Sequence, residues 1–137
     1  MNKRTKLSLL LLVTGFVIAA LASVMPFSST KRVAAQAQAN GEAIYQERCV
    51  FCHGENGDGN GAVAKYLNPR PRDFTSGQFK FRTTASGELP LREDVINIVK
   101  KGVRGTAMPN WEGILADAEI EAVVDYITQN FVPGWGS

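Results

Sequence analysis

The sequence predicts a small all-α domain preceded by an N-terminal hydrophobic helix. Apolar side chains recur at the spacing of one helix face in the two C-terminal segments. Four segments of the domain are expected to be helical: 41–53, 62–67, 92–101 and 117–131. The chain therefore divides into residues 1–39, a hydrophobic segment with a polar tether, and residues 40–137, which are long enough for one folded domain.

The N-terminal segment contains an uncharged apolar run, residues 7–25, that follows three basic residues. At about 1.5 Å per residue, a helix of this length crosses the ~30 Å hydrocarbon layer of a membrane. Its basic end stays in the cytoplasm. A signal peptide cleaved after the small-residue pattern Ala37-Gln38-Ala39 is the alternative. Both interpretations export the domain that follows.

The first helix of the domain, residues 41–53, is expected to begin after Asn40, a residue type that favours the N-cap position. Ile44 and Tyr45 supply its inner face. Its end carries both cysteines of the chain and the one histidine.

These three residues, Cys49, Cys52 and His53, form the C-x-x-C-H pattern of covalent haem attachment. Two thiols three residues apart on a helical turn can form thioethers with the two vinyl groups of one haem, and the adjacent imidazole can bind the iron as its proximal ligand. One motif predicts one haem c.

Other functions of Cys49, Cys52 and His53 are less well supported by the sequence. A structural zinc site needs a fourth protein ligand, and the chain has no further Cys or His to supply it. A thioredoxin-like redox pair would follow a strand, whereas residues 42–48 look helical. A local disulfide in an oxidising compartment stays open.

Beyond the motif, the glycine-rich stretch 54–61 is interpreted as a flexible turn over the haem. The prolines after the short helix 62–67 forbid helix continuation. Segment 92–101 stops at Gly102, a residue type that commonly follows a helix. The last helix, 117–131, places its apolar residues on one stripe.

Met108 is the one methionine of residues 40–137, and it lies in a loop with Gly105 and Pro109 between two helical segments. A thioether aimed at the iron suits this position, which makes Met108 the predicted sixth ligand. An adaptable filler of the core is the alternative role of a single methionine. In that case the sixth position of the iron would be filled by a lysine or would stay open.

The charge of the chain is unevenly distributed. All 13 acidic residues and ten of the 15 basic residues follow residue 39, which gives the domain a net charge of −3 and argues against nucleic-acid binding. Segment 65–104 nevertheless has a net charge of +5. It is either a docking face for an acidic partner or a solvated surface.

The sequence resembles class I cytochromes c, the small single-haem proteins, of the bacterial membrane-anchored or periplasmic type. The resemblance is carried by residues 41–45 (GEAIY), 49–54 (CVFCHG), the glycines at 57, 59 and 61, the loop 106–111 (TAMPNW) and the C-terminal helix. It implies a cytochrome c fold, with about four short helices around one covalently bound haem.

The resemblance also implies roles for other residues. A proline-loop carbonyl, that of Pro69 or Pro71, should accept the second N–H of His53. Trp111 is expected either to pack in the core or to donate its indole N–H to a haem propionate. Gly41 and Tyr126 should meet where the first and last helices cross.

The function implied is electron transfer. A haem with both axial positions filled has no vacant site for substrate, and no acid/base or nucleophile constellation is present, so the protein is not expected to be an enzyme. It should carry one electron between respiratory redox partners on the periplasmic side of the bacterial cytoplasmic membrane. The alternatives are a fixed haem c subunit of a larger membrane oxidoreductase complex and, if Met108 is not a ligand, a gas-binding haem sensor. Membrane attachment would be through residues 7–25 if they are retained.

Overall fold

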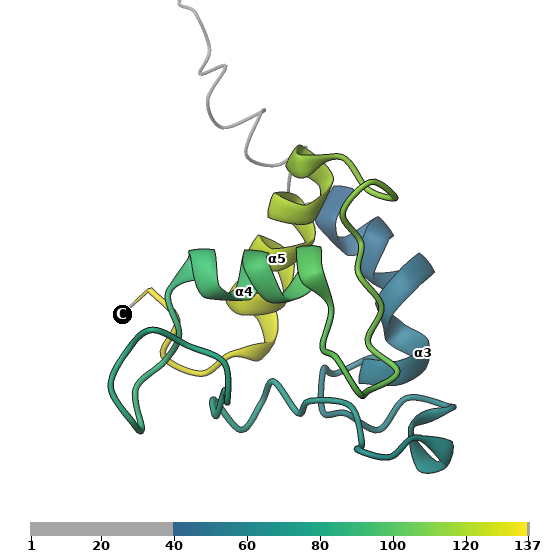
Figure 1. The fold of residues 1–137 in the computed structure, drawn as a ribbon, viewed down its shortest axis with the longest axis horizontal. Coiled ribbons are helices and arrows are strands. Elements are labelled where there is room, and N and C mark those ends of the chain that lie inside the picture. Colours follow the sequence, from purple (N-terminus) through teal and green to yellow (C-terminus); the bar gives the residue numbers. More distant parts are fainter. Residues whose placement is uncertain (1–39, 137) are drawn as a thin grey trace, which may run out of the picture. The chain divides into compact units, whose positions relative to one another are not determined.

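The computed structural model describes residues 40–136, which lie in one compact unit (Figure 1). The hydrophobic helix, tether and cleavage site predicted for residues 1–39 lie outside the described residues. Within the described range, helices form every regular element, and none is both long and apolar enough to cross a lipid bilayer. The all-α fold class is confirmed.

Within the described residues, the first helix covers residues 40–53, and part of it is widened into a π-helix, η1 (Tyr45–Cys49), which leads into α3 (Val50–His53). Ile44 and Tyr45 are buried, as predicted. The prediction of Asn40 as N-cap is wrong, because Asn40 is itself helical and an N-cap residue has a non-helical backbone. π turns are frequent at functional sites, and this one ends at Cys49.

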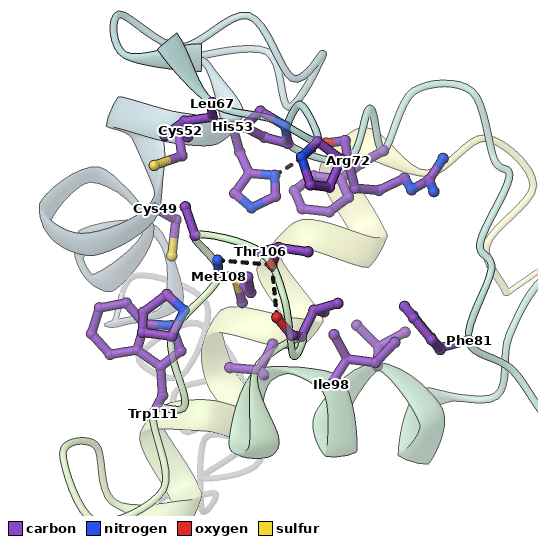
Figure 2. Close-up of a pocket in the computed structure, with 18 of the residues that line it drawn as sticks. Cys49, Cys52, His53, Leu67, Arg72, Phe81, Ile98, Thr106, Met108 and Trp111 are labelled. Carbon is purple, nitrogen blue, oxygen red and sulfur yellow. Dashed lines mark hydrogen bonds between the residues drawn. The ribbon is translucent and has the colours of Figure 1, made fainter.

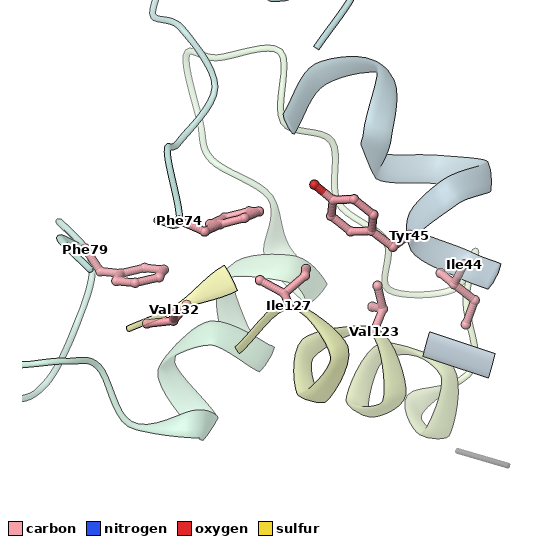
Figure 3. Close-up of a cluster of buried hydrophobic side chains, with 7 residues drawn as sticks. All are labelled: Ile44, Tyr45, Phe74, Phe79, Val123, Ile127 and Val132. Atoms are coloured by element: carbon pink, nitrogen blue, oxygen red, sulfur yellow. The ribbon is translucent and has the colours of Figure 1, made fainter. Parts of the chain in front are cut away.

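The first helix crosses the last one, α5 (Asp117–Phe131), at Gly41. A Cβ atom at Gly41 would lie 2.2 Å from the carbonyl oxygen of Ala122 and 3.0 Å from Cβ of Tyr126, so only glycine permits this approach. The predicted crossing partners are confirmed. Below the crossing lies a buried apolar cluster (Figure 3), made of Ile44, Tyr45, Phe74, Phe79, Val123, Ile127 and Val132.

Helix α4 (Arg92–Lys101) packs on α5 through a second buried cluster of Val95, Val99, Ile120 and Val124. An ion pair joins the same two helices, since Arg92 donates to both carboxylate oxygens of Asp125, at 2.6 and 2.9 Å. Gly102 ends α4 with a φ of 65°, as its residue type predicted. Residues 92–101 and 117–131 are therefore helical with the bounds expected from their apolar stripes.

The glycine-rich loop 54–61 does not cover the main cavity of the domain, which corrects the interpretation as a turn over the haem. It folds back on α3, with the amide of Gly59 bonded to the carbonyl of His53 and that of Gly61 to the carbonyl of Cys52. A Cβ at Gly61 would lie 2.3 Å from the Phe51 carbonyl oxygen. The glycines thus permit tight packing. The helix expected at 62–67 is one 3-10 turn, η2 (Ala64–Tyr66).

The substitution Gly41→Ala tests the crossing. Alanine favours the helical backbone by up to about 1 kcal/mol, but its methyl group overlaps the Ala122 carbonyl and forces the two helices apart. We expect the free energy of unfolding to fall by about 1–3 kcal/mol in denaturant titrations followed by circular dichroism. The control is Glu42→Ala on the exposed face of the same helix, which should stay within about 0.5 kcal/mol of the wild type. An unchanged stability of Gly41→Ala would show that the helices do not pack this closely.

Candidate functional site

The domain contains a cavity of about 490 Å³. Its walls come from the end of the first helix, the proline loop after η2, the inner face of α4 and the loop that follows α4. Cys49, Cys52, His53 and Met108 all line it (Figure 2). The structure therefore brings together, from segments more than 50 residues apart in the chain, the four residues that the sequence singled out for cofactor chemistry.

The two cysteines lie on consecutive turns at the end of the first helix, and neither forms a disulfide bond. Burial, and then the neighbouring Cys52, raise the pKa of Cys49 to about 12. Among residues 40–136, no three Cys, His, Asp or Glu side chains are grouped so that they could hold a metal ion by themselves. The arrangement does not match the geometry of a zinc site.

The imidazole of His53 is held on two sides. Its Nδ1 lies 3.1 Å from the carbonyl oxygen of Arg72, and its ring stacks on Phe74 with a centroid distance of 4.5 Å. A carbonyl oxygen can only accept, so this hydrogen bond requires the proton on Nδ1 and leaves a lone pair on Nε2. Burial lowers the pKa of His53, although the hydrogen bond to Arg72 opposes this effect. The histidine is thus prepared as a neutral metal ligand.

The acceptor of this hydrogen bond corrects a prediction. The carbonyl belongs to Arg72, one residue beyond Pro71, and not to Pro69 or Pro71. Both prolines line the cavity instead. Their rings fix the direction of the chain, but which carbonyl meets the imidazole depends on the path after Pro71, where the backbone continues to Phe74.

Tyr45, which the sequence predicted only as a core residue, also holds the end of the helix that carries the C-x-x-C-H motif. The hydroxyl of buried Tyr45 donates to the carbonyl oxygen of Gly54 over 2.6 Å. Gly54 directly follows His53 and has a φ of 83°, so the bond secures the turn in which the chain leaves the helix. No sequence pattern distinguished this tyrosine from an ordinary core aromatic residue.

The opposite wall is formed by the loop after α4. Met108 is half-buried there, and its carbonyl oxygen accepts a hydrogen bond from the Val103 amide at 3.2 Å. Trp111 closes the loop, with its amide 3.2 Å from the carbonyl oxygen of Val99, and its side chain both lines the cavity and packs on the second core cluster. The predicted bond from the Trp111 indole to a propionate stays a prediction.

The interior of the cavity is mainly apolar, and the charged residues in its lining are basic. Phe74 and Phe79 are buried against it, while Phe81, 56% exposed, lies on its solvent side. The charged residues that line it are all basic: Arg48, Arg70, Arg72, Lys80 and Arg104. Four of the five come from segment 65–104, whose net charge of +5 was noted in the sequence.

These observations fit a haem. The volume lies within the range of small-molecule and cofactor sites, ~300–1,000 Å³, and the walls are mainly apolar. Two free thiols, an imidazole with an available lone pair and a thioether all line one space. Such a donor set matches covalent haem attachment with His and Met available to the iron.

Comparison with known proteins agrees with this chemistry. The family model described as "Cytochrome C oxidase, cbb3-type, subunit III" matches residues 36–127. The chain therefore belongs to this family and carries a cytochrome c domain, an electron-transfer domain that binds haem c covalently. The resemblance to single-haem cytochromes c is confirmed.

Individual relatives differ in what they are named for. The cbb3-type cytochrome c oxidase subunit FixP of Bradyrhizobium diazoefficiens is 35% identical over 65% of this chain and 26% of the relative. A thiosulfate dehydrogenase of Allochromatium vinosum is 42% identical over 40% of this chain and 24% of the relative. The chain thus spans about a quarter of the length of these curated relatives.

Among solved structures, a chain of the reducing HAO-like protein complex of Kuenenia stuttgartiensis superposes with a TM-score of 0.65. It is 39% identical, and the match covers 68% of this chain and 41% of that one. The likeness agrees with the cytochrome c fold described above.

The Tyr45 hydroxyl can be tested by Tyr45→Phe. The substitution keeps the ring and removes one of the two donors to the Gly54 carbonyl, which also accepts from the Gly57 amide at 3.2 Å. The free energy of unfolding should therefore fall by about 1 kcal/mol. Chemical denaturation measures it. The control is Tyr66→Phe, whose ring is 75% exposed and whose hydroxyl can be replaced by water. Equal stabilities for the two variants would contradict a structural role of the Tyr45 bond.

Proposed function

We propose that this domain is a single-electron carrier in which Cys49 and Cys52 attach the haem and His53 and Met108 are the axial ligands of its iron. The observation that supports the proposal best is the common cavity lined by both thiols, the Nδ1-bonded imidazole and Met108. When bound there, haem c supplies an iron that accepts and releases one electron.

The residues of the chain hold and shield this centre. Arg72 and Phe74 fix the plane of the His53 imidazole, and the amide of Val103 fixes the carbonyl of Met108. The buried Phe74 and Phe79 keep water from the interior of the cavity. A Met/His ligand pair together with a dry surrounding favours the reduced iron and so a relatively high potential.

With both axial positions held by the chain, substrate has no place on the iron, and we propose that the domain is not an enzyme in its own right. The similarity to a thiosulfate dehydrogenase covers 40% of this chain and 24% of that protein. Electrons would then enter and leave through the edge of the cofactor that faces the partner protein.

The basic residues around the cavity support docking of partners with acidic surfaces. Lys80 and Arg104 are exposed, and no Asp or Glu is among the residues that line the cavity. Two haem propionates and Glu47, which pairs with Arg48 at 2.9 Å, would still leave the lining cations in excess. Such a field raises the rate at which acidic redox partners associate.

For the whole chain, we place the cytochrome c domain at residues 40–137 on the periplasmic side of the bacterial cytoplasmic membrane. Residues 7–25 would either anchor it or serve as a signal peptide. A second candidate function is that of a fixed haem c subunit in a larger oxidoreductase. It is supported by relatives that are named as an oxidase subunit and as part of a complex. Co-purification from membranes in mild detergent distinguishes a subunit from a shuttle.

The axial ligand is tested by Met108→Ala. The reduced wild type should not bind carbon monoxide, whereas the variant should bind it because one axial position is open. Its reduction potential should also fall, on the order of 0.1 V within the ~0.8 V range that axial ligands span. Ile98→Ala truncates another residue of the cavity wall and should do neither. Optical spectra and redox titration provide the measurements. Carbon monoxide binding by the reduced wild type would indicate an open iron and support the gas-binding alternative.

The basic docking surface is tested with small oxidants of opposite charge. Oxidation of the reduced protein by anionic hexacyanoferrate(III) should slow by about tenfold as ionic strength rises from low to physiological values, while oxidation by cationic tris(phenanthroline)cobalt(III) should not slow. Lys80→Gln with Arg104→Gln should weaken the dependence for the anion. The control pair is Lys65→Gln with Lys101→Gln, outside the cavity lining. Equal effects of the two pairs would assign the dependence to net charge alone.

A further inference from the structure

We propose that Thr106 is a positioning residue for the sixth iron ligand: its hydroxyl holds the backbone of Met108 and thereby determines how firmly Met108 stays bound. The inference rests on the proposed ligation by Met108. It goes further because it names the group that keeps a flexible side chain available to the iron.

The loop that carries Met108 begins at the end of α4. Gly102 turns the chain there, and a Cβ atom at this position would lie 2.7 Å from the carbonyl oxygen of Met108. The amide of Val103 then donates to that carbonyl, and the carbonyl of Val103 accepts from the amide of Thr106, both over 3.2 Å. Val103 therefore bonds to both ends of the turn through its backbone.

The Thr106 hydroxyl lies inside this turn and uses both of its hydrogen-bonding capacities (Figure 2). It donates to the carbonyl oxygen of Val103 at 2.8 Å and accepts from the amide of Met108 at 3.1 Å. Because the Met108 carbonyl is held by the Val103 amide, both backbone polar groups of Met108 have a partner within the turn. The Thr106 hydroxyl supplies the side-chain hydrogen bonds of the turn, and Val103 supplies the backbone ones.

Met108 itself packs against the second core cluster, whereas other residues of the turn face solvent. Gly105, Ala107 and Pro109 are exposed, and a Cβ atom at Gly105 would meet nothing within 4 Å. Methionine has three rotatable side-chain bonds and adapts to many positions. Hydrogen bonds within the turn therefore add to the order that the packing of Met108 provides. A loop released from the iron would lose the two bonds of the hydroxyl or exchange them for water.

The experiment is a titration of the oxidised, haem-loaded protein with imidazole at constant pH, followed by the optical spectrum as imidazole replaces Met108. Thr106→Val keeps the shape of the side chain and removes the hydroxyl. We expect half-replacement at about tenfold lower imidazole than in the wild type, since one net hydrogen bond is worth roughly a factor of ten. Thr106→Ala should follow Thr106→Val and serves if the latter does not load haem. Thr106→Ser retains the hydroxyl and should stay within about twofold of the wild type.

The matched control is Thr84→Val, which removes a hydroxyl that donates to the Leu89 carbonyl in a different loop. It should leave the imidazole midpoint unchanged, whereas a general loss of stability would move both. The inference is overturned if Thr106→Val and Thr106→Ala match the wild type, or if Thr106→Ser is as weak as they are. Failure of the proposed ligation looks different, because Met108→Ala would then give the same titration and spectrum as the wild type.

Discussion

The close approach of the first helix to α5 at Gly41 is the constraint on which the site depends. Cys49, Cys52 and His53 are at the far end of this helix, so the angle and depth of the crossing determine where they stand relative to α4 and its loop. The buried cluster beneath the crossing includes Tyr45, which also bonds to Gly54. One tyrosine thus connects the helix crossing to the turn that follows the histidine.

The two walls that face each other across the cavity are built differently. The wall with the histidine is part of a helix and is further held by a carbonyl and by an aromatic stack. The methionine wall is a largely exposed turn, in which Met108 packs on the second core cluster and hydrogen bonds anchor the backbone to the end of α4. This difference matches their proposed chemistry, since attachment through two cysteines leaves the histidine side no freedom, whereas the methionine can leave and return.

Much of this could be predicted from the sequence. The apolar stripes correctly predicted the bounds of α4 and α5, and the spacing of Cys49, Cys52 and His53 identified the cofactor class. The errors concern backbone choices that distant segments decide. Asn40 has the side chain of an N-cap, but the helix already includes it. The backbone path between Pro71 and Phe74 makes the Arg72 carbonyl the acceptor for His53. Every residue has a backbone carbonyl, so the sequence does not indicate which of them meets the imidazole. The Thr106 hydroxyl bonds to Val103, three residues before it, and to Met108, two residues after it. These contacts exist only once the turn has formed.

The ion pair between Arg92 and Asp125 has a consequence for the rate of electron transfer. It joins α4, which leads to the methionine turn, with α5, which supports the helix that carries the histidine. Rearrangement of the ligands between the oxidised and reduced states adds to the activation barrier of electron transfer. If His53 and Met108 are the ligands as proposed, a frame that ties both walls together would limit this reorganisation, and Arg92 would contribute to the rate of exchange without lining the cavity.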